Sequence, residues 1–156
     1  MNNLRDLIVR LEKTREPDRE VDYDILRIIN PDQYANAERI AKTKLKEAEA
    51  NGLTDREEAC YRYAFAFTPN YTSSVDDARK LLPWDKHPGA ELHVRMVQSG
   101  YGDFYAFVEF TWPSTERQGR ARTEPVATCI AALLAVEETD RQMAPYRGRA
   151  ALKTAQ

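Results

Sequence analysis

Aromatic and basic side chains gather in the stretch from residue 84 to residue 122. The set is Trp84, His93, Arg95, Tyr101, Tyr105, Phe107, Arg117, Arg120 and Arg122. Aromatic rings stack nucleobases, and the guanidinium fork of arginine binds phosphate oxygens in pairs. The pattern therefore predicts a site for a nucleotide-like ligand. The alternative is that the rings are core residues covered by helices, with the arginine side chains lying over them.

A second group of candidate binding residues lies earlier in the chain. Tyr71, Thr72 and Ser73 precede a short stretch with helical spacing that begins at Val75. Hydroxyl groups at such a place typically cap the helix by accepting hydrogen bonds from its free backbone N–H groups. The same N–H groups are also suited to hold a phosphate or a carboxylate. Both interpretations of these three residues stay open at this point.

Residue sets that carry catalysis or bind metal are missing from the sequence pattern. The two histidines, His87 and His93, belong to no recognisable nucleophile–base motif. The two cysteines, Cys60 and Cys129, show no paired metal-ligand spacing. The context of Cys129 is one apolar face of a helix, which indicates core packing. We therefore predict a protein without catalytic residues, metal ions or cofactors.

The composition sets limits on the class of protein. The chain has 156 residues and a formal net charge of −2, which argues against a basic surface that binds nucleic acid stably. Hydrophobic residues make up 42%, which is too many for a disordered chain. No apolar run reaches the roughly 18–20 residues of a membrane span. The first residues lack the apolar core of a signal peptide, so we expect a location in a reducing compartment.

The apolar spacing predicts several helices. Leu4, Leu7, Ile8 and Leu11 form one stripe, and a second stripe follows Asp18 and ends at Asn30-Pro31. Further helices are expected over 32–51, 54–67, 75–82 and from Thr123 onward. The last of these has its stripe at Val126, Ile130, Leu133 and Leu134.

In two segments, successive side chains fall on alternate faces in the pattern that is typical of half-buried strands. They are Glu91–Val97 and Phe104–Trp112, and the turn Ser99–Asp103 between them predicts an antiparallel pair. Both faces of the second strand are partly apolar, so we expect it to be central or covered on both sides. Pro113–Arg122 is expected to be a polar connection.

The end of the chain carries a weakly basic segment. Pro145 and Gly148 are expected to break any helix, so residues 141–156 are predicted to form a flexible basic tail. The alternative is an arm that reaches a partner subunit or an anionic ligand. The rest, residues 1–140, is predicted to be one α+β domain with a helical insertion at about 32–67.

Three motifs, in this order, resemble those of the phage ABA sandwich domain family. They are Leu7–Glu12 followed by Pro17–Asp22, Tyr71–Ala78 ending at Leu81–Pro83, and Ala127–Leu133. The family consists of small proteins encoded by phages and prophages. The resemblance implies an α/β sandwich, with helices packed on a short antiparallel sheet, and implies no catalytic residues. Relatives often carry a Trp-rich segment between the first two motifs, where this chain has two predicted helices.

These observations lead to two hypotheses about function. The first is a non-enzymatic phage or prophage accessory protein that binds a small nucleotide-like ligand and so sequesters a host immune signal. Its ligand-binding residues would be Tyr71, Thr72, Ser73, Arg95, Tyr101, Tyr105, Arg117, Arg120 and Arg122. The alternative is a protein-interaction module that inhibits a host defence protein through the helices at 32–51 and 59–67. We expect a homo-oligomer, because ligand pockets often form between subunits.

Overall fold

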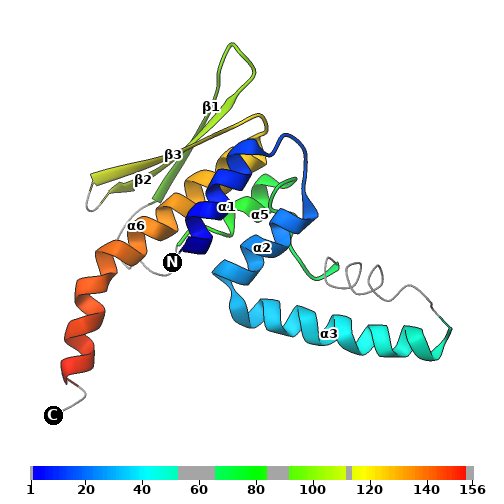
Figure 1. Cartoon of the computed structure of the whole chain (residues 1–156). Coiled ribbons are helices and arrows are strands. Elements are labelled where there is room, and N and C mark those ends of the chain that lie inside the picture. The colour runs from blue at the N-terminus through cyan, green and yellow to red at the C-terminus, as the bar shows by residue number, and fades with distance from the viewer. Residues whose placement is uncertain (1, 53–65, 84–91, 112–113, 154–156) are drawn as a thin grey trace.

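The computed structural model describes residues 2–52, 66–83, 92–111 and 114–153. In this part of the chain, five helices pack with a three-stranded antiparallel sheet, which confirms the α+β fold class (Figure 1). The elements in chain order are α1 (Asn2–Lys13), α2 (Arg19–Ile29), α3 (Pro31–Ala50), α5 (Val75–Arg79), β1 (Leu92–Gln98), β2 (Phe104–Thr111), β3 (Ser114–Ala121) and α6 (Glu124–Lys153).

Helices α1 and α2 form where the apolar stripes predict them. Leu7, Ile8 and Leu11 of α1 are buried, so the stripe faces the core. The carboxylate of Asp18 caps α2 by accepting hydrogen bonds from the backbone N–H groups of Glu20 and Val21. The N-terminal part of the fold therefore follows from local sequence rules.

Helix α3 confirms the polar helix expected over 32–51. It contacts α2 and extends away from the sheet (Figure 1). Its apolar residues Ala37, Ala41 and Leu45 are buried in the chain, and most of its other described side chains are exposed. Nearly all of the helix expected over 54–67 lies outside the described residues.

The sheet has the order β1-β2-β3, so β2 is its central strand, as expected. The expectation that Pro113–Arg122 is a polar connection is wrong, because Ser114–Ala121 pairs with β2 along its whole length. This strand shows no apolar alternation, since Arg117 and Gly119 occupy positions on its helix-facing side. Pairing with β2, rather than a local pattern, defines β3.

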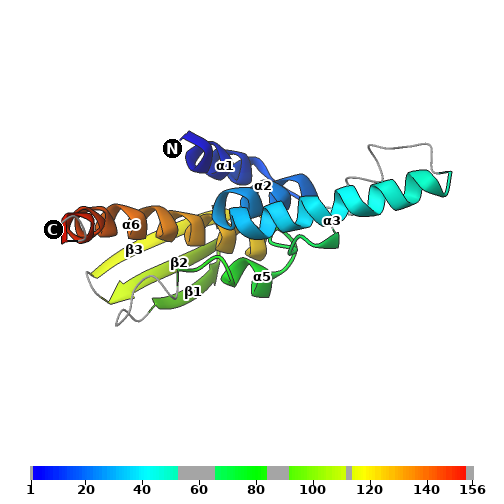
Figure 2. The same ribbon diagram turned by 90° about the horizontal axis from the view of Figure 1, so that it is seen from below.

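Helix α6 packs closely on one face of the sheet, here called the inner face (Figure 2). Ala106 and Val108 of β2 point into this contact and are fully buried. Gly119 of β3 pairs with Ala106, and a Cβ atom at Gly119 would lie 2.6 Å from the backbone nitrogen of Ala131. Small side chains on the inner face therefore let α6 approach the strands.

Helix α6 also corrects the expectation for the end of the chain. The backbone is helical to Lys153, through both Pro145 and Gly148. The expectation that these two residues break the helix is therefore wrong. A proline removes one backbone hydrogen bond, and the Ala, Arg and Gln residues around it favour helix, so the long helix continues. None of the described helices is long and apolar enough to cross a bilayer.

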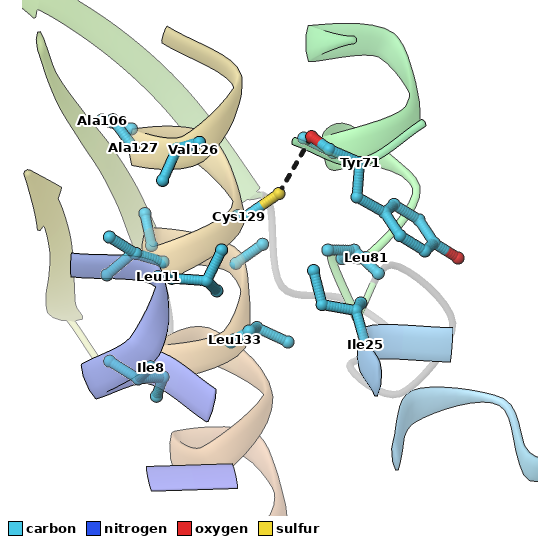
Figure 3. Close-up of a cluster of buried hydrophobic side chains, with 14 of the residues drawn as sticks. Ile8, Leu11, Ile25, Tyr71, Leu81, Ala106, Val126, Ala127, Cys129 and Leu133 are labelled. Atoms are coloured by element: carbon cyan, nitrogen blue, oxygen red, sulfur yellow. Dashed lines mark hydrogen bonds between the residues drawn. The ribbon is translucent and has the colours of Figure 1, made fainter. Parts of the chain in front are cut away.

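The hydrophobic core surrounds α6. Leu11 of α1, Ile25 of α2 and Leu81, which follows α5, all pack against it (Figure 3). Cys129 and Leu133 of α6 are fully buried in this cluster. The core thus holds α1 and α2 on the side of α6 that faces away from the sheet (Figure 2). Neither helix lies on the face of the sheet opposite α6.

Candidate functional site

The face of the sheet opposite α6 is the candidate site, and we call it the outer sheet face. Side chains alternate along a strand, so every second residue of β1, β2 and β3 points to this face. Its described residues are Arg95, Val97, Tyr105, Phe107, Glu109, Glu116, Gln118 and Arg120. No helix in the described part of the chain covers it (Figures 1 and 2).

Two arginines lie over the two aromatic rings of this face. The guanidinium carbon of Arg95 is 4.2 Å from the centroid of the Phe107 ring. The guanidinium carbon of Arg120 is 5.6 Å from the centroid of the Tyr105 ring. A cation over a ring face is attracted by the ring quadrupole. The arginines lie over the rings as the second interpretation expected, but no described helix covers the rings.

Acidic residues that the sequence analysis did not select complete the arrangement around Arg95. Its Nε lies 3.5 Å from Glu109 Oε1, and one terminal nitrogen lies 3.6 Å from Glu116 Oε2. Both distances exceed that of a good charge-assisted hydrogen bond, and the side chain of Arg95 is 55% exposed. Arg95 is therefore oriented by a ring and two carboxylates without being enclosed.

Asp103 organises the arginines at the hairpin end of the outer sheet face. Arg120 donates two hydrogen bonds to Asp103 Oδ2, at 3.0 and 2.6 Å, and Arg122 lies 3.2 Å from Oδ1. These hydrogen bonds from Arg120, together with the charge of Arg122, hold the pKa of Asp103 below its ordinary value. Tyr101, in the turn beside them, is 93% exposed. Arg120, Arg122 and Tyr101 thus lie at one end of the face.

Arg117 does not belong to this group, contrary to the expectation. It pairs with the buried Val108, so it points to the inner face. There it donates to Glu138 of α6, which also accepts from Arg141 and Gln142. Burial raises the pKa of Glu138, but these hydrogen bonds outweigh it and lower the pKa to about 2. Arg117 joins the sheet to α6 and is not available to a ligand on the outer sheet face.

Tyr71, Thr72 and Ser73 lie apart from the other predicted binding residues. Tyr71 is buried on the side of α6 away from the sheet, where its carbonyl oxygen accepts a hydrogen bond from Cys129 (Figure 3). Burial raises the pKa of Tyr71 to about 12. Ser73 is exposed, and the cap of α5 is the hydroxyl of the next residue, Ser74.

Thr72 is buried and takes part in a link between two distant segments. Its hydroxyl accepts from the backbone N–H of Asp18, and its own N–H donates to Asp22 Oδ1 at 2.7 Å. Arg19 holds the other oxygen of Asp22 at 2.7 Å and donates to the carbonyl oxygens of Thr68 and Pro69. These polar groups tie α2 to the segment before α5, so their interactions support a structural role.

A polar hollow at the junction of α1 and α2 is a weaker candidate. Its lining includes Arg10, Lys13, Arg15 and Arg19 together with acidic residues. Arg10 already lies 2.8 Å from Asp24. It is also within 4 Å of the carboxylates of Asp18 and Glu20. The hollow thus supplies its own anions, and the described residues that line it include no aromatic ring.

The described residues contain no group of three or more His, Cys, Asp and Glu side chains that could hold a metal ion. His87 and the side chain of His93 lie outside the described part of the chain.

Comparisons with known proteins identify no relative. No protein-family model matches the chain, and neither a curated protein nor a solved structure matches it. The resemblance to the phage ABA sandwich domain family therefore stays a prediction from the motifs. The function has to be inferred from the outer sheet face itself.

Proposed function

We propose that this protein is a non-catalytic nucleotide-binding protein and that the outer sheet face is its binding surface. The observation that carries the proposal is the pair Arg95–Phe107, with the guanidinium carbon 4.2 Å from the ring centroid on a face that no described helix covers. A base that stacks on Phe107 would take the place of the Arg95 guanidinium over the ring, and Arg95 would then contact the phosphate.

The charges around Arg95 support exchange of one anion for another. Glu109 and Glu116 contact Arg95 at 3.5 and 3.6 Å, so neither carboxylate holds it tightly. A phosphate oxygen that approaches Arg95 can make the shorter, charge-assisted hydrogen bonds that these carboxylates do not.

The resemblance to a phage family extends the proposal to a biological role. A protein that binds a nucleotide-like immune signal of the host would remove it from solution and needs no catalytic group for this. The protein would act in the cytoplasm of the host, as a homo-oligomer if two copies share a ligand. This role rests on the motif resemblance in addition to the geometry of the outer sheet face.

Calorimetric titration with AMP and GMP tests the proposal. We expect binding that is weakened at least tenfold by Phe107→Leu, which keeps an apolar side chain, and by Arg95→Gln. Phe67→Leu and Arg27→Gln are matched controls, because Phe67 is 47% exposed, the Arg27 side chain is 52% exposed, and neither residue belongs to the sheet. Absence of binding, or equal loss in the controls, would overturn the proposal.

Native mass spectrometry of protein purified from a bacterial host adds an independent test. A symmetric oligomer that carries an extra nucleotide-sized mass, released on denaturation, would support sequestration and identify the ligand. Loss of that mass in Phe107→Leu, with the oligomer intact, would assign it to the outer sheet face. A ligand that stays bound in this variant would contradict the assignment.

The alternative function is that of a protein-interaction module. The exposed side chains of Val97 and Tyr101 favour it, since aromatic and apolar residues at a surface often anchor protein partners. In that case a host polypeptide would co-purify in stoichiometric amount, and Tyr101→Ser would release it. The same preparation would show no response to AMP or GMP.

A further inference from the structure

We infer that the outer sheet face binds single-stranded nucleic acid, with two neighbouring unpaired bases stacked on Tyr105 and Phe107. This inference rests on the proposed function for its surface and names a larger ligand than a mononucleotide.

The sequence of β2 carries the first argument. Sheets that bind single-stranded RNA often contain the pattern Lys/Arg–Gly–aromatic–Gly/Ala–Phe–Val–any–aromatic. The six residues Tyr105–Phe110 read Tyr-Ala-Phe-Val-Glu-Phe and match its last six positions. The first two positions differ, because this chain has Asp103 and Phe104 there. The likeness is confined to this one strand, in a sheet of order β1-β2-β3.

The orientation of the strand is the second argument. In such a strand the aromatic residues must point away from the helices, and the small and branched residues must point toward them. Ala106 and Val108 are fully buried on the inner face, while Tyr105 and Phe107 lie half-buried on the outer one. Both the pattern and its orientation therefore suit stacking of bases on this face, which no described helix covers, once Arg95 and Arg120 move from the rings to the phosphates.

The spacing of the two rings indicates which form of nucleic acid fits. Positions two apart in a strand are separated by about 6.8 Å along it, whereas stacked neighbours in a duplex are about 3.4 Å apart. Two adjacent bases can each cover one ring only if they are unstacked from one another. A single strand allows this and a duplex does not, so the surface selects unpaired bases.

The charges of the face indicate where the phosphates lie. The basic position of the pattern is acidic here, but Arg120 and Arg122 both bind Asp103 and bring positive charge to the same end of β2. Arg95 supplies positive charge on β1, the strand on the other side of β2. The acids Asp103, Glu109 and Glu116 balance these arginines, so stacking rather than net charge would drive binding. The net charge of −2 opposes binding of phosphates in general and leaves this mode open.

Fluorescence anisotropy with a 5′-labelled single-stranded RNA hexamer of mixed sequence tests the inference. We expect binding at low salt that falls about 5- to 150-fold in Tyr105→Leu and again in Phe107→Leu, the range for loss of one stacked base. Phe107→Tyr keeps a ring and should bind as the unchanged protein does. Phe67→Leu is the control for loss of an exposed ring elsewhere, and thermal melting checks that each variant is folded.

The outcomes separate this inference from the proposed function. The same hexamer annealed to its complement should bind at least tenfold more weakly than the single strand. Equal affinity for AMP and for the hexamer, both lost in Phe107→Leu, would overturn the two-base inference and keep the nucleotide site. Duplex binding as tight as single-strand binding would also overturn the inference. No binding of AMP, GMP or the hexamer would overturn both proposals.

Discussion

Gly119 of β3 lies against the carbonyl oxygen of Ala127 in α6, with no room for a side chain between them. A Cβ atom at Gly119 would overlap that oxygen and lie 2.6 Å from the backbone nitrogen of Ala131. Both obstacles are backbone atoms of a helix, which cannot rotate away as a side chain does. This contact sets the distance between α6 and the sheet, and so the position of the outer sheet face.

The first prediction concerns this contact. Gly119→Ala should lower the free energy of unfolding by about 3 kcal/mol, because the added methyl group forces the helix and the strand apart. Urea denaturation followed by circular dichroism measures the change. Gly100→Ala is the matched control, since nothing lies within 4 Å of a Cβ atom there. Equal stability of the two variants would contradict the close packing of α6 on β3.

The second prediction concerns the carboxylate of Glu138, which joins β3 to α6. Its pKa in the fold is about 2, against an ordinary value of 4.5, so its ionised form stabilises the folded state above pH 4.5. This stabilisation is lost as the pH falls toward 2. Glu138→Gln should therefore lower the free energy of unfolding by about 2 kcal/mol at pH 7, and the difference should shrink below pH 4.5.

Denaturation of both proteins across pH 2–7 measures this difference. Glu137→Gln is the control, since the side chain of Glu137 is 38% exposed and its partner Arg5 is 79% exposed. Such an ion pair at the surface contributes little to stability, so Glu137→Gln should change the free energy of unfolding by less than about 0.5 kcal/mol. A loss in Glu138→Gln that does not depend on pH would show that packing, rather than charge, is responsible.

The third prediction separates the roles of Asp22, which is fully buried. Asp22→Ala leaves the buried N–H of Thr72 without its acceptor and should lower the free energy of unfolding by about 2–4 kcal/mol. Burial raises the pKa of Asp22 despite the nearby Arg19, so a neutral acceptor should be tolerated better. Asp22→Asn should thus be less destabilising in urea denaturation. Equal effects would assign the stability to the ion pair with Arg19.

The fourth prediction concerns the reactivity of Cys129. Burial raises the pKa of this thiol, and Sγ donates a hydrogen bond to the carbonyl oxygen of Tyr71 at 3.2 Å. In a Cys60→Ser background, which leaves one thiol, Cys129 should react with a disulfide reagent only when the core opens. Reaction rates measured against urea concentration should follow unfolding. Fast reaction of the folded protein would contradict the burial of Cys129.

Much of the fold is predictable from local patterns. The apolar stripe at Leu7, Ile8 and Leu11 and the cap at Asp18 predict α1 and α2, because a helix repeats every 3.6 residues. The alternation of side chains in Phe104–Thr111 predicts β2 in the same way, because the side chains of a strand return to the same face every two residues. The residues Tyr105 and Phe107 of the candidate site follow from this pattern as well.

The rest is decided by contacts between residues far apart in the chain. Strand β3 forms because Ser114–Ala121 pairs with β2, and its own residues carry no strand pattern. Arg117 points to Glu138, 21 residues away, whereas Arg95 lies over Phe107 on the opposite face. Thr72 is committed to Asp22, 50 residues away. Local periodicity shows which residues share a face of an element, but only packing decides what each face meets, and thus which arginines stay available to a ligand.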